Sequence, residues 1–314
     1  MTDIKQYSVS EPYLKLDCGL GEAPFWEEAP NILRFVDIVK CHLHTIALDE
    51  GPASHKQVEL DNSIGTTADI EGSEDSFAFG GKKGYGVFDK KTASYKYIKK
   101  VWTDDEVAAE AEKYFRANDG AVDSQGRYWL GMMNDPLESE FTDKAIVFRL
   151  DPDMSLHRMI ENVTLPNGVS WSLDDKTMYF VDSVTKNIWA YDFDAPSGNI
   201  SNRRVFFHVD DPNGKGVPDG HAMDEHGYIW QAIHGMGKVV RISPEGKIVA
   251  EISLPTLCVT CPGFVGEDLF ITSAEEEEPD KYPDSAKLQG SLFRCHVGVE
   301  GKKLHRFKAP VKII

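Results

Sequence analysis

The chain has few cysteines, no long apolar run and no excess of basic residues. Its 314 residues include five cysteines, an odd and sparse count that fits a reducing compartment better than a disulfide framework. No apolar run reaches the roughly eighteen residues that a membrane-spanning helix needs. The segment Met1–Gln6 lacks the basic and then apolar stretches of a secretory signal. These absences together predict a cytoplasmic protein.

The balance of charge excludes two classes of partner. Lys and Arg number 34 and Asp and Glu number 51, so the net charge is −17. Nucleic-acid binding needs clustered basic residues that neutralise phosphate, and an acidic protein is repelled by anionic membrane surfaces. We therefore expect neither nucleic acid nor membrane as a partner. The acidic residues serve solubility, or some of them line a cation site.

Long amphipathic helical patterns are also almost absent. Short segments rich in aromatic and β-branched residues, bounded by Gly, Asp and Pro, predict strands instead. These segments are Ile32–Asp37, Ser76–Phe79, Arg127–Gly131, Lys176–Asp182, Tyr228–Ala232 and Asp268–Thr272. Two stretches differ. Thr103–Tyr114 predicts a short helix capped by Thr103, and Glu275–Lys287 is a solvated loop or a lid.

The strand pattern repeats six times. One marker precedes each repeat, and successive markers lie 43, 53, 49, 52 and 44 residues apart. The markers are Glu22, Gly65, Asn118, Asn167, Asp219 and Gly263. This period, with about four short strands a unit, is typical of a propeller. We predict an all-β, six-bladed β-propeller forming a single domain over residues 1–314. Residues 1–12 are expected to be a loose tail, and Leu14–Asp17 to close the ring against the last blade.

Several markers carry an oxygen-bearing side chain beside Gly or Pro. Glu22, Asn167 and Asp219 are of this kind, as are the neighbours Asn118 and Asp119. Each by itself is a common turn residue. If all of them point at the axis of one propeller, they provide oxygen ligands for a single hard cation such as Ca²⁺, Mg²⁺ or Mn²⁺. Asp219 is the first candidate for a general base that deprotonates a water.

Other chemical motifs are missing or isolated. No Gly-x-Ser-x-Gly elbow occurs, which disfavours a serine hydrolase, and no Gly-x-Gly-x-x-Gly phosphate cradle occurs. Cys258 and Cys261 form one CxxC pair without a second, so a structural zinc site is disfavoured, and we expect both thiols near the axis. His221 follows Asp219 closely, and either approaches the pocket or packs in the core.

The motifs taken in order resemble the regucalcin (senescence marker protein)/gluconolactonase family. They extend from about residue 18 to residue 300, so the resemblance covers nearly the whole chain. The matching segments are Gly21–Trp26, Phe35–Ile38, Arg116–Gly120, Asp123–Trp129 with Gly131–Met133, Pro166–Ser172, Tyr179–Ser183, Ile200–Arg204, Val217–Gly220 and Ile271–Ala274.

The resemblance implies one catalytic divalent metal at the axis of a six-bladed propeller. The ligands of the family fall on Glu22, Asn167 and Asp219, and its substrate-contacting Arg and Asn fall on Arg116 and Asn118. Where animal regucalcins have a glutamate that contacts the sugar, this chain has Pro136, with Asp135 beside it. We therefore take Asp135 as a further substrate contact, and the preferred lactone is open.

The sequence thus supports a metal-dependent lactonase that acts on an aldonolactone such as glucono-, xylono- or arabinonolactone. The metal is Ca²⁺, Zn²⁺, Mg²⁺ or Mn²⁺, and the protein is expected to be a monomer or a weak homodimer. Two alternatives stay open. The same site could hydrolyse an organophosphate or another ester or lactone, or the propeller could bind calcium without catalysis.

Overall fold

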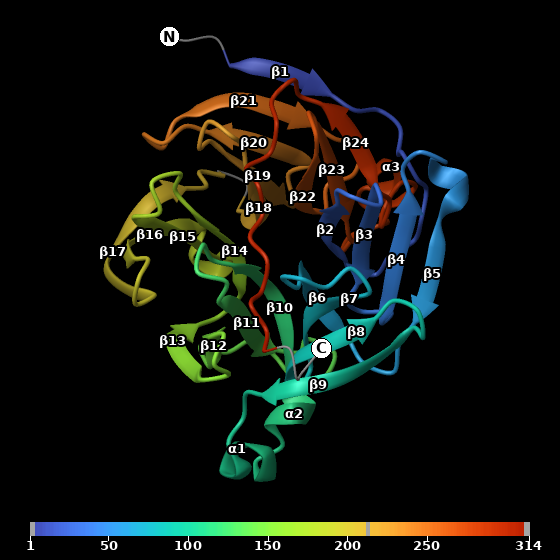
Figure 1. Ribbon diagram of the computed structural model, residues 1–314. Coiled ribbons are helices and arrows are strands. Elements are labelled where there is room, and N and C mark those ends of the chain that lie inside the picture. The colour runs from blue at the N-terminus through green and yellow to red at the C-terminus, as the bar shows by residue number, and fades with distance from the viewer. Residues whose placement is uncertain (1–3, 212–213, 311–314) are drawn as a thin grey trace.

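The computed structural model describes residues 4–211 and 214–310. Six small sheets follow one another around a central axis, which confirms the predicted all-β, six-bladed propeller (Figure 1). Apart from β1 (Lys5–Ser8), which adds to the outer edge of one sheet, the strands of each sheet follow chain order from the axis outward, and sequential strands pair antiparallel. We number the sheets as blades 1 to 6 in chain order.

Five blades have their four strands in sequence order, and the sixth has three. Blade 1 contains β2 (Gly21–Glu27), β3 (Ile32–Asp37), β4 (His42–Ala47) and β5 (Lys56–Glu59). Blade 2 contains β6 (Ile64–Asp69), β7 (Ser76–Gly81), β8 (Gly84–Asp89) and β9 (Ser94–Lys100). Blade 3 contains β10 (Phe115–Val122), β11 (Tyr128–Asn134), β12 (Ala145–Leu150) and β13 (Leu156–Val163). Blade 4 contains β14 (Pro166–Trp171), β15 (Thr177–Asp182), β16 (Asn187–Asp194) and β17 (Asn199–His208). Blade 5 contains β18 (Val217–Met223), β19 (Ile229–His234), β20 (Lys238–Ile242) and β21 (Ile248–Ser253). Blade 6 contains β22 (Val259–Val265), β23 (Asp268–Ser273) and β24 (Phe293–His296).

The helices are short and lie outside the blades. They are α1 (Asp104–Ala108), α2 (Ala111–Tyr114), α3 (Pro283–Ala286) and the 3₁₀ turns η1 (Pro52–Ser54) and η2 (Ser183–Thr185). Thr103 caps α1 and forms the expected capping box with Glu106. The predicted single helix is nevertheless wrong, because Glu110 adopts a left-handed conformation with φ of 62° and separates α1 from α2. Both helices project from the rim of the ring (Figure 1).

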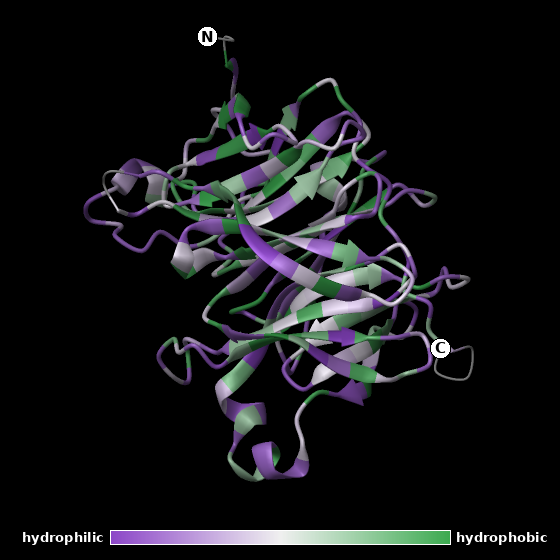
Figure 2. Cartoon of the chain, turned by 90° about the vertical axis from the view of Figure 1, so that its left-hand side faces the viewer, coloured by the Kyte–Doolittle hydropathy of each residue, from purple (hydrophilic) through white to green (hydrophobic). Residues whose placement is uncertain are grey.

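The hydrophobic core is divided into six clusters, one in each seam between adjacent blades. Alternation along a strand explains this division, since successive side chains point to opposite faces. In β11, Tyr128 and Leu130 pack toward blade 2 while Trp129 packs toward blade 4. Seen from the side, hydropathy accordingly changes from residue to residue along the strands (Figure 2).

The ring closes through its inner strands and its N-terminal segment. β22 of blade 6 contacts β2 of blade 1, and Leu14 forms a bridge with Leu292. The predicted closure against the last blade is confirmed at Leu14, although no strand forms there. The expectation of a loose tail is wrong for Lys5–Ser8, which form β1 and pair in parallel with β21. Backbone hydrogen-bonding groups on an outer strand of blade 5 explain the docking of this segment.

The C-terminal segment, residues 300–308, crosses one end of the ring, and we call it the C-terminal strap (Figure 1). It begins beside blade 5, where Lys302 N donates to Met223 O at 2.9 Å. It ends beside blade 2, where the fully buried Phe307 donates to Asp69 O at 2.8 Å. Lys302 Nζ also donates to Trp171 O of blade 4 at 2.7 Å. The strap therefore joins the far ends of several inner strands.

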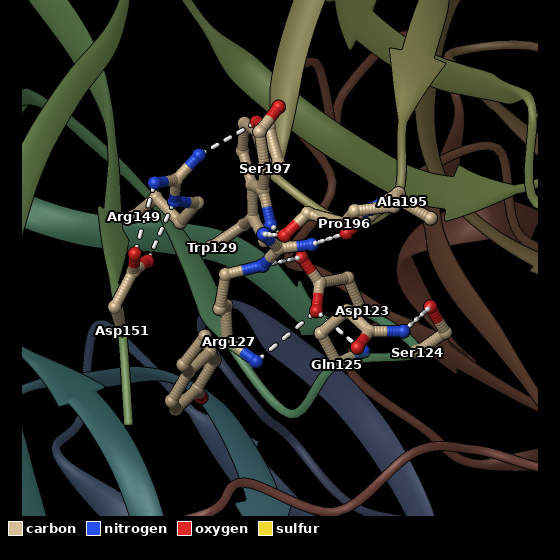
Figure 3. Close-up of polar contacts among 12 residues, drawn as sticks. Asp123, Ser124, Gln125, Arg127, Trp129, Arg149, Asp151, Ala195, Pro196 and Ser197 are labelled. Carbon is tan, nitrogen blue, oxygen red and sulfur yellow. Dashed lines mark hydrogen bonds and ion pairs between the residues drawn. The ribbon is translucent and has the colours of Figure 1, made fainter. Parts of the chain in front are cut away.

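A buried aspartate closes the turn after the inner strand in blades 3 and 5. Asp123 accepts hydrogen bonds from Arg127 Nε at 2.7 Å and Trp129 Nε1 at 2.9 Å (Figure 3). Asp224 accepts in the same way from Trp230 Nε1 at 3.0 Å and Arg241 Nε at 2.8 Å. Both carboxylates also accept backbone N–H groups of their own turn. We call these two arrangements the aspartate clasps.

Within the described ranges, no helix is both long and apolar enough to cross a bilayer.

Candidate active site

Each inner strand has a register shift close to its first residue. An irregularity of this kind is a β-bulge, which bends the strand and re-aims a side chain. The shifts fall between Glu22 and Phe25, Ile64 and Thr66, Ala117 and Gly120, Asn167 and Val169, Pro218 and His221, and Val259 and Pro262. Four of the predicted polar markers therefore stand at equivalent bulges, all at the end of the ring opposite the C-terminal strap.

The two glycine markers serve close packing. A Cβ on Gly65 would lie 2.4 Å from Asn118 O, so only glycine lets β6 approach β10 there. A Cβ on Gly263 would lie 2.4 Å from Pro24 O of blade 1. Gly263 is not at the bulge of β22, which falls at Thr260 and Cys261 instead. The sixth marker was thus two or three residues too far along the chain.

A chain of hydrogen bonds joins three of the predicted site residues. Arg116 Nη1 donates to Asn118 Oδ1 at 2.8 Å, and Asn118 Nδ2 donates to Asn167 Oδ1 at 2.9 Å. Asn167 Nδ2 donates in turn to Ser183 Oγ at 2.8 Å. These bonds orient the Asn167 amide, and its oxygen keeps a second lone pair for a ligand. Both amide atoms of Asn118 have protein partners, so this residue holds its neighbours in place.

The carboxylates of Glu22 and Asp219 are buried without a matching number of cationic partners. They are 4% and 8% exposed. Burial and the charges of Asp219 and Asp119 raise the pKa of Glu22 well above its ordinary value. Burial raises the pKa of Asp219 to about 7, an effect that His234 and Arg116 oppose and Asp119 reinforces. The fold therefore holds these acids where their charged forms are disfavoured.

Asp119 and Cys261 belong to the same surroundings. Burial raises the pKa of Asp119 to about 6. Burial also raises the pKa of Cys261 well above its ordinary value, and the charges of Glu22, Asp119 and Asp219 add to the shift. Cys261 lies at the bulge of the inner strand β22, and both thiols of the CxxC pair are free and buried.

Asp135 lies beside Arg116 but already has partners. Its Oδ1 is 3.8 Å from Arg116 Nε, and its Oδ2 accepts from Lys82 Nζ at 3.2 Å. Lys82 was not among the residues that the sequence singled out. The available signal was its position in the turn between β7 and β8, at the same end of the ring as the start of β6.

His234, at the end of β19, connects Asp219 to a separate cavity. Its Nδ1 lies 3.7 Å from Asp219 Oδ2, and its Nε2 lies 3.4 Å from Glu277 Oε1. Burial alone would lower the pKa of His234, but hydrogen bonds to Cys258 and Glu277 and the charge of Asp219 raise it overall. The cavity measures about 240 Å³, and segment 275–287 provides one of its walls. It is lined by Lys215, His234, Gly235, Leu257, Cys258, Glu276, Glu277, Glu278 and Tyr282.

The residues fit a divalent cation in donor chemistry and in charge. Two carboxylates and one amide oxygen are the ligands that Ca²⁺, Mg²⁺ and Mn²⁺ favour. A cation between Glu22 and Asp219 would stabilise charged forms that burial disfavours. Among residues 4–211 and 214–310 no group of three His, Cys, Asp or Glu side chains forms a metal cluster, and the expected set contains only two such side chains. The metal and substrate roles stay predictions.

Comparisons with known proteins agree on one family. The profile of the family described as "SMP-30/Gluconolactonase/LRE-like region" matches residues 20–275. Regucalcin of Danio rerio is 33% identical, with 92% of this chain and 96% of that protein covered. A Bacillus subtilis protein with the provisional name sugar lactone lactonase YvrE is 30% identical over 90% of this chain and 92% of its own.

Two solved structures have the same fold. A luciferin-regenerating enzyme superposes with a TM-score of 0.81 at 25% identity, covering 93% of this chain and 96% of its own. A calcium-binding regucalcin from Agrobacterium tumefaciens superposes with a TM-score of 0.84 at 23% identity, covering 97% and 99%.

Proposed function

Because the chain belongs to the SMP-30/gluconolactonase family, we propose that it is a divalent-metal-dependent hydrolase that opens the ester ring of an aldonolactone. The observation that carries the proposal is the buried pair Glu22 and Asp219 at the bulges of β2 and β18, with Asn167 at the matching bulge of β14. Buried acids whose pKa values are raised in this way cluster at functional sites.

The site residues would have separate roles in binding the cation, activating water and binding the substrate. Glu22, Asn167 and Asp219 would hold the cation, which when bound supplies a Lewis acid for the lactone carbonyl. Asp219 would take a proton from the attacking water onto a carboxylate oxygen. Arg116 would bind a lactone oxygen, since a guanidinium has five N–H donors and Nη1 serves Asn118 and Ala117.

Two residues near Arg116 would assist binding. Asn118 would act by fixing Arg116 and Asn167, because both atoms of its amide are already bonded. Asp135 would meet the sugar hydroxyls together with Lys82, its ion-pair partner. A lactone bound here would thus meet a lysine donor as well as a carboxylate acceptor.

Acid release from lactones tests the proposal directly. Purified protein should acidify a weakly buffered solution of glucono-, xylono- or arabinonolactone faster than the spontaneous hydrolysis measured without protein. EDTA should stop the reaction, and Ca²⁺, Zn²⁺, Mg²⁺ or Mn²⁺, added singly, should identify the metal that restores it. No acceleration with any lactone and any metal would refute the activity.

A second candidate is calcium binding without catalysis. It is favoured by the relatives named regucalcin and by the solved neighbour described as a calcium-binding protein. This alternative predicts Ca²⁺ binding by calorimetry in a protein that turns over no lactone. The same panel therefore distinguishes the two functions.

A further inference from the structure

A chain of polar side chains links β14 to β18, the two strands that carry Asn167 and Asp219. Ser170 Oγ lies 2.7 Å from His221 Nε2, and His221 Nδ1 lies 3.2 Å from Gln231 Oε1. Gln231 is fully buried, and its Nε2 donates to Asp219 O at 2.9 Å and Gly220 O at 3.1 Å. The chain therefore ends on the backbone of the bulge that carries Asp219.

The carbonyl groups fix the direction of every hydrogen bond in this chain. Carbonyl oxygens can only accept, so the amide nitrogen of Gln231 must face Asp219 and Gly220. Its oxygen then faces His221, whose Nδ1 must carry the proton. His221 Nε2 is left as an acceptor for the hydroxyl of Ser170. Gln231 Nε2 also donates to Ala232 O at 2.9 Å, so all of its acceptors are backbone carbonyls and the orientation of the side-chain amide is fixed.

Packing supports the same link between the two strands. A Cβ on Gly168 would lie 2.3 Å from His221 Nδ1, so the imidazole lies directly against the residue that follows Asn167. A Cβ on Gly220 would lie 2.5 Å from Cys261 Sγ of blade 6. The backbone of the β18 bulge is thus confined from both neighbouring blades, and Gln231 holds it from within its own blade.

From these contacts we infer that Ser170, His221 and Gln231 are positioning residues that set the distance and orientation of Asp219 relative to Asn167. The inference rests on the proposed function, because it assigns the network to the geometry of the proposed cation site. The hydrogen bonds reach the backbone of Asp219 and leave its carboxylate free. The network therefore acts on cation affinity through the placement of a ligand.

Cation binding measured apart from turnover tests the inference. Gln231→Leu removes the amide with little change in size, and supporting residues around metal ligands typically change affinity about 10-fold to 100-fold. We expect the dissociation constant for Ca²⁺ or Zn²⁺, measured by calorimetry, to rise by this factor. Tyr85→Phe is the matched control, since Tyr85 Oη donates across the seam between blades 2 and 3 to Tyr128 O at 3.0 Å. It should lower the melting temperature and leave cation affinity unchanged.

The outer end of the network gives a milder pair of variants in case Gln231→Leu does not fold. Ser170→Ala should weaken cation binding, and Ser170→Thr, which keeps the hydroxyl, should restore it. Unchanged affinity in Gln231→Leu, or equal affinity in the two Ser170 variants, would overturn the inference alone. A wild-type protein that binds none of Ca²⁺, Zn²⁺, Mg²⁺ and Mn²⁺ would overturn the proposed function and the inference with it.

Discussion

Buried carboxylates at the two ends of the inner strands differ in their hydrogen-bond partners. At the strap end, Asp123 and Asp224 are fully buried, and each accepts hydrogen bonds from an arginine, a tryptophan and the backbone of its turn. At the other end, Glu22 and Asp219 are almost as buried, yet burial and neighbouring acids raise their pKa values. At one end the acids have several hydrogen-bond donors each, and at the other end burial disfavours their charged forms.

This difference separates residues that hold the fold from residues that serve the site. A carboxylate with four or more hydrogen-bond donors stabilises the turn that it closes, and its loss leaves those donors buried and unpaired. A carboxylate whose charged form is disfavoured costs stability in the absence of a ligand. Burial alone would not distinguish Asp224 from Asp219, but their partners do.

The largest expected effect is on activity, from Asp219→Asn. Lactone turnover should fall about 100-fold to 10,000-fold, the usual contribution of a general base. The melting temperature in EDTA should stay the same or rise, because the substitution removes one of the mutually repelling buried charges. Initial rates of acid release check the predicted loss of turnover, and thermal melts in EDTA check the predicted stability. Full activity, or a large loss of stability in EDTA, would contradict the assignment of Asp219.

For Asp224→Asn we expect a loss of stability without a loss of activity. The change leaves Arg241 and Trp230 facing a neutral amide, and breaking a buried charged pair costs about 3–5 kcal/mol of unfolding free energy. Urea unfolding should show this loss, while turnover per folded molecule is retained. Asp143→Asn, at an exposed turn, is the control and should change neither quantity. If Asp224→Asn were as stable as wild type, the carboxylates at the strap end would not have the structural role that we assign to them.

The smallest effect concerns the C-terminal strap. Lys302→Met keeps the aliphatic stem and removes the ammonium that donates to Trp171 O. A single half-buried hydrogen bond contributes about 1 kcal/mol, so the urea midpoint should fall slightly and the slope should not change. Lactone turnover should be unaffected, because the strap lies at the far end from the site. A large loss of activity would show that the two ends are coupled.

Much of the fold was predictable because its signals are local. Alternating apolar residues predicted the strands, and Gly126 and Gly227 close the turns before two of them with φ of 82° and 80°. The interval between markers predicted six blades. The errors arose where contacts are distant. The docking of Lys5–Ser8 on β21 depends on an edge that lies over 200 residues away in the chain, and nothing near Gly263 reveals that the bulge of β22 lies at Cys261.

In the candidate site, too, local signals were predictable and distant contacts were not. Local sequence was enough to mark Glu22, Asn167 and Asp219, since each is an oxygen-bearing residue next to Gly or at a recurring position. It was not enough to find Lys82 beside Asp135 or Gln231 behind Asp219, because these partners come from other strands. The sequence by itself determined the number of blades and the polar groups near the start of four inner strands. Only the closing of the ring decided which of those groups share one buried space, because the energy of a buried charge depends on all of its neighbours and not on its place in the chain.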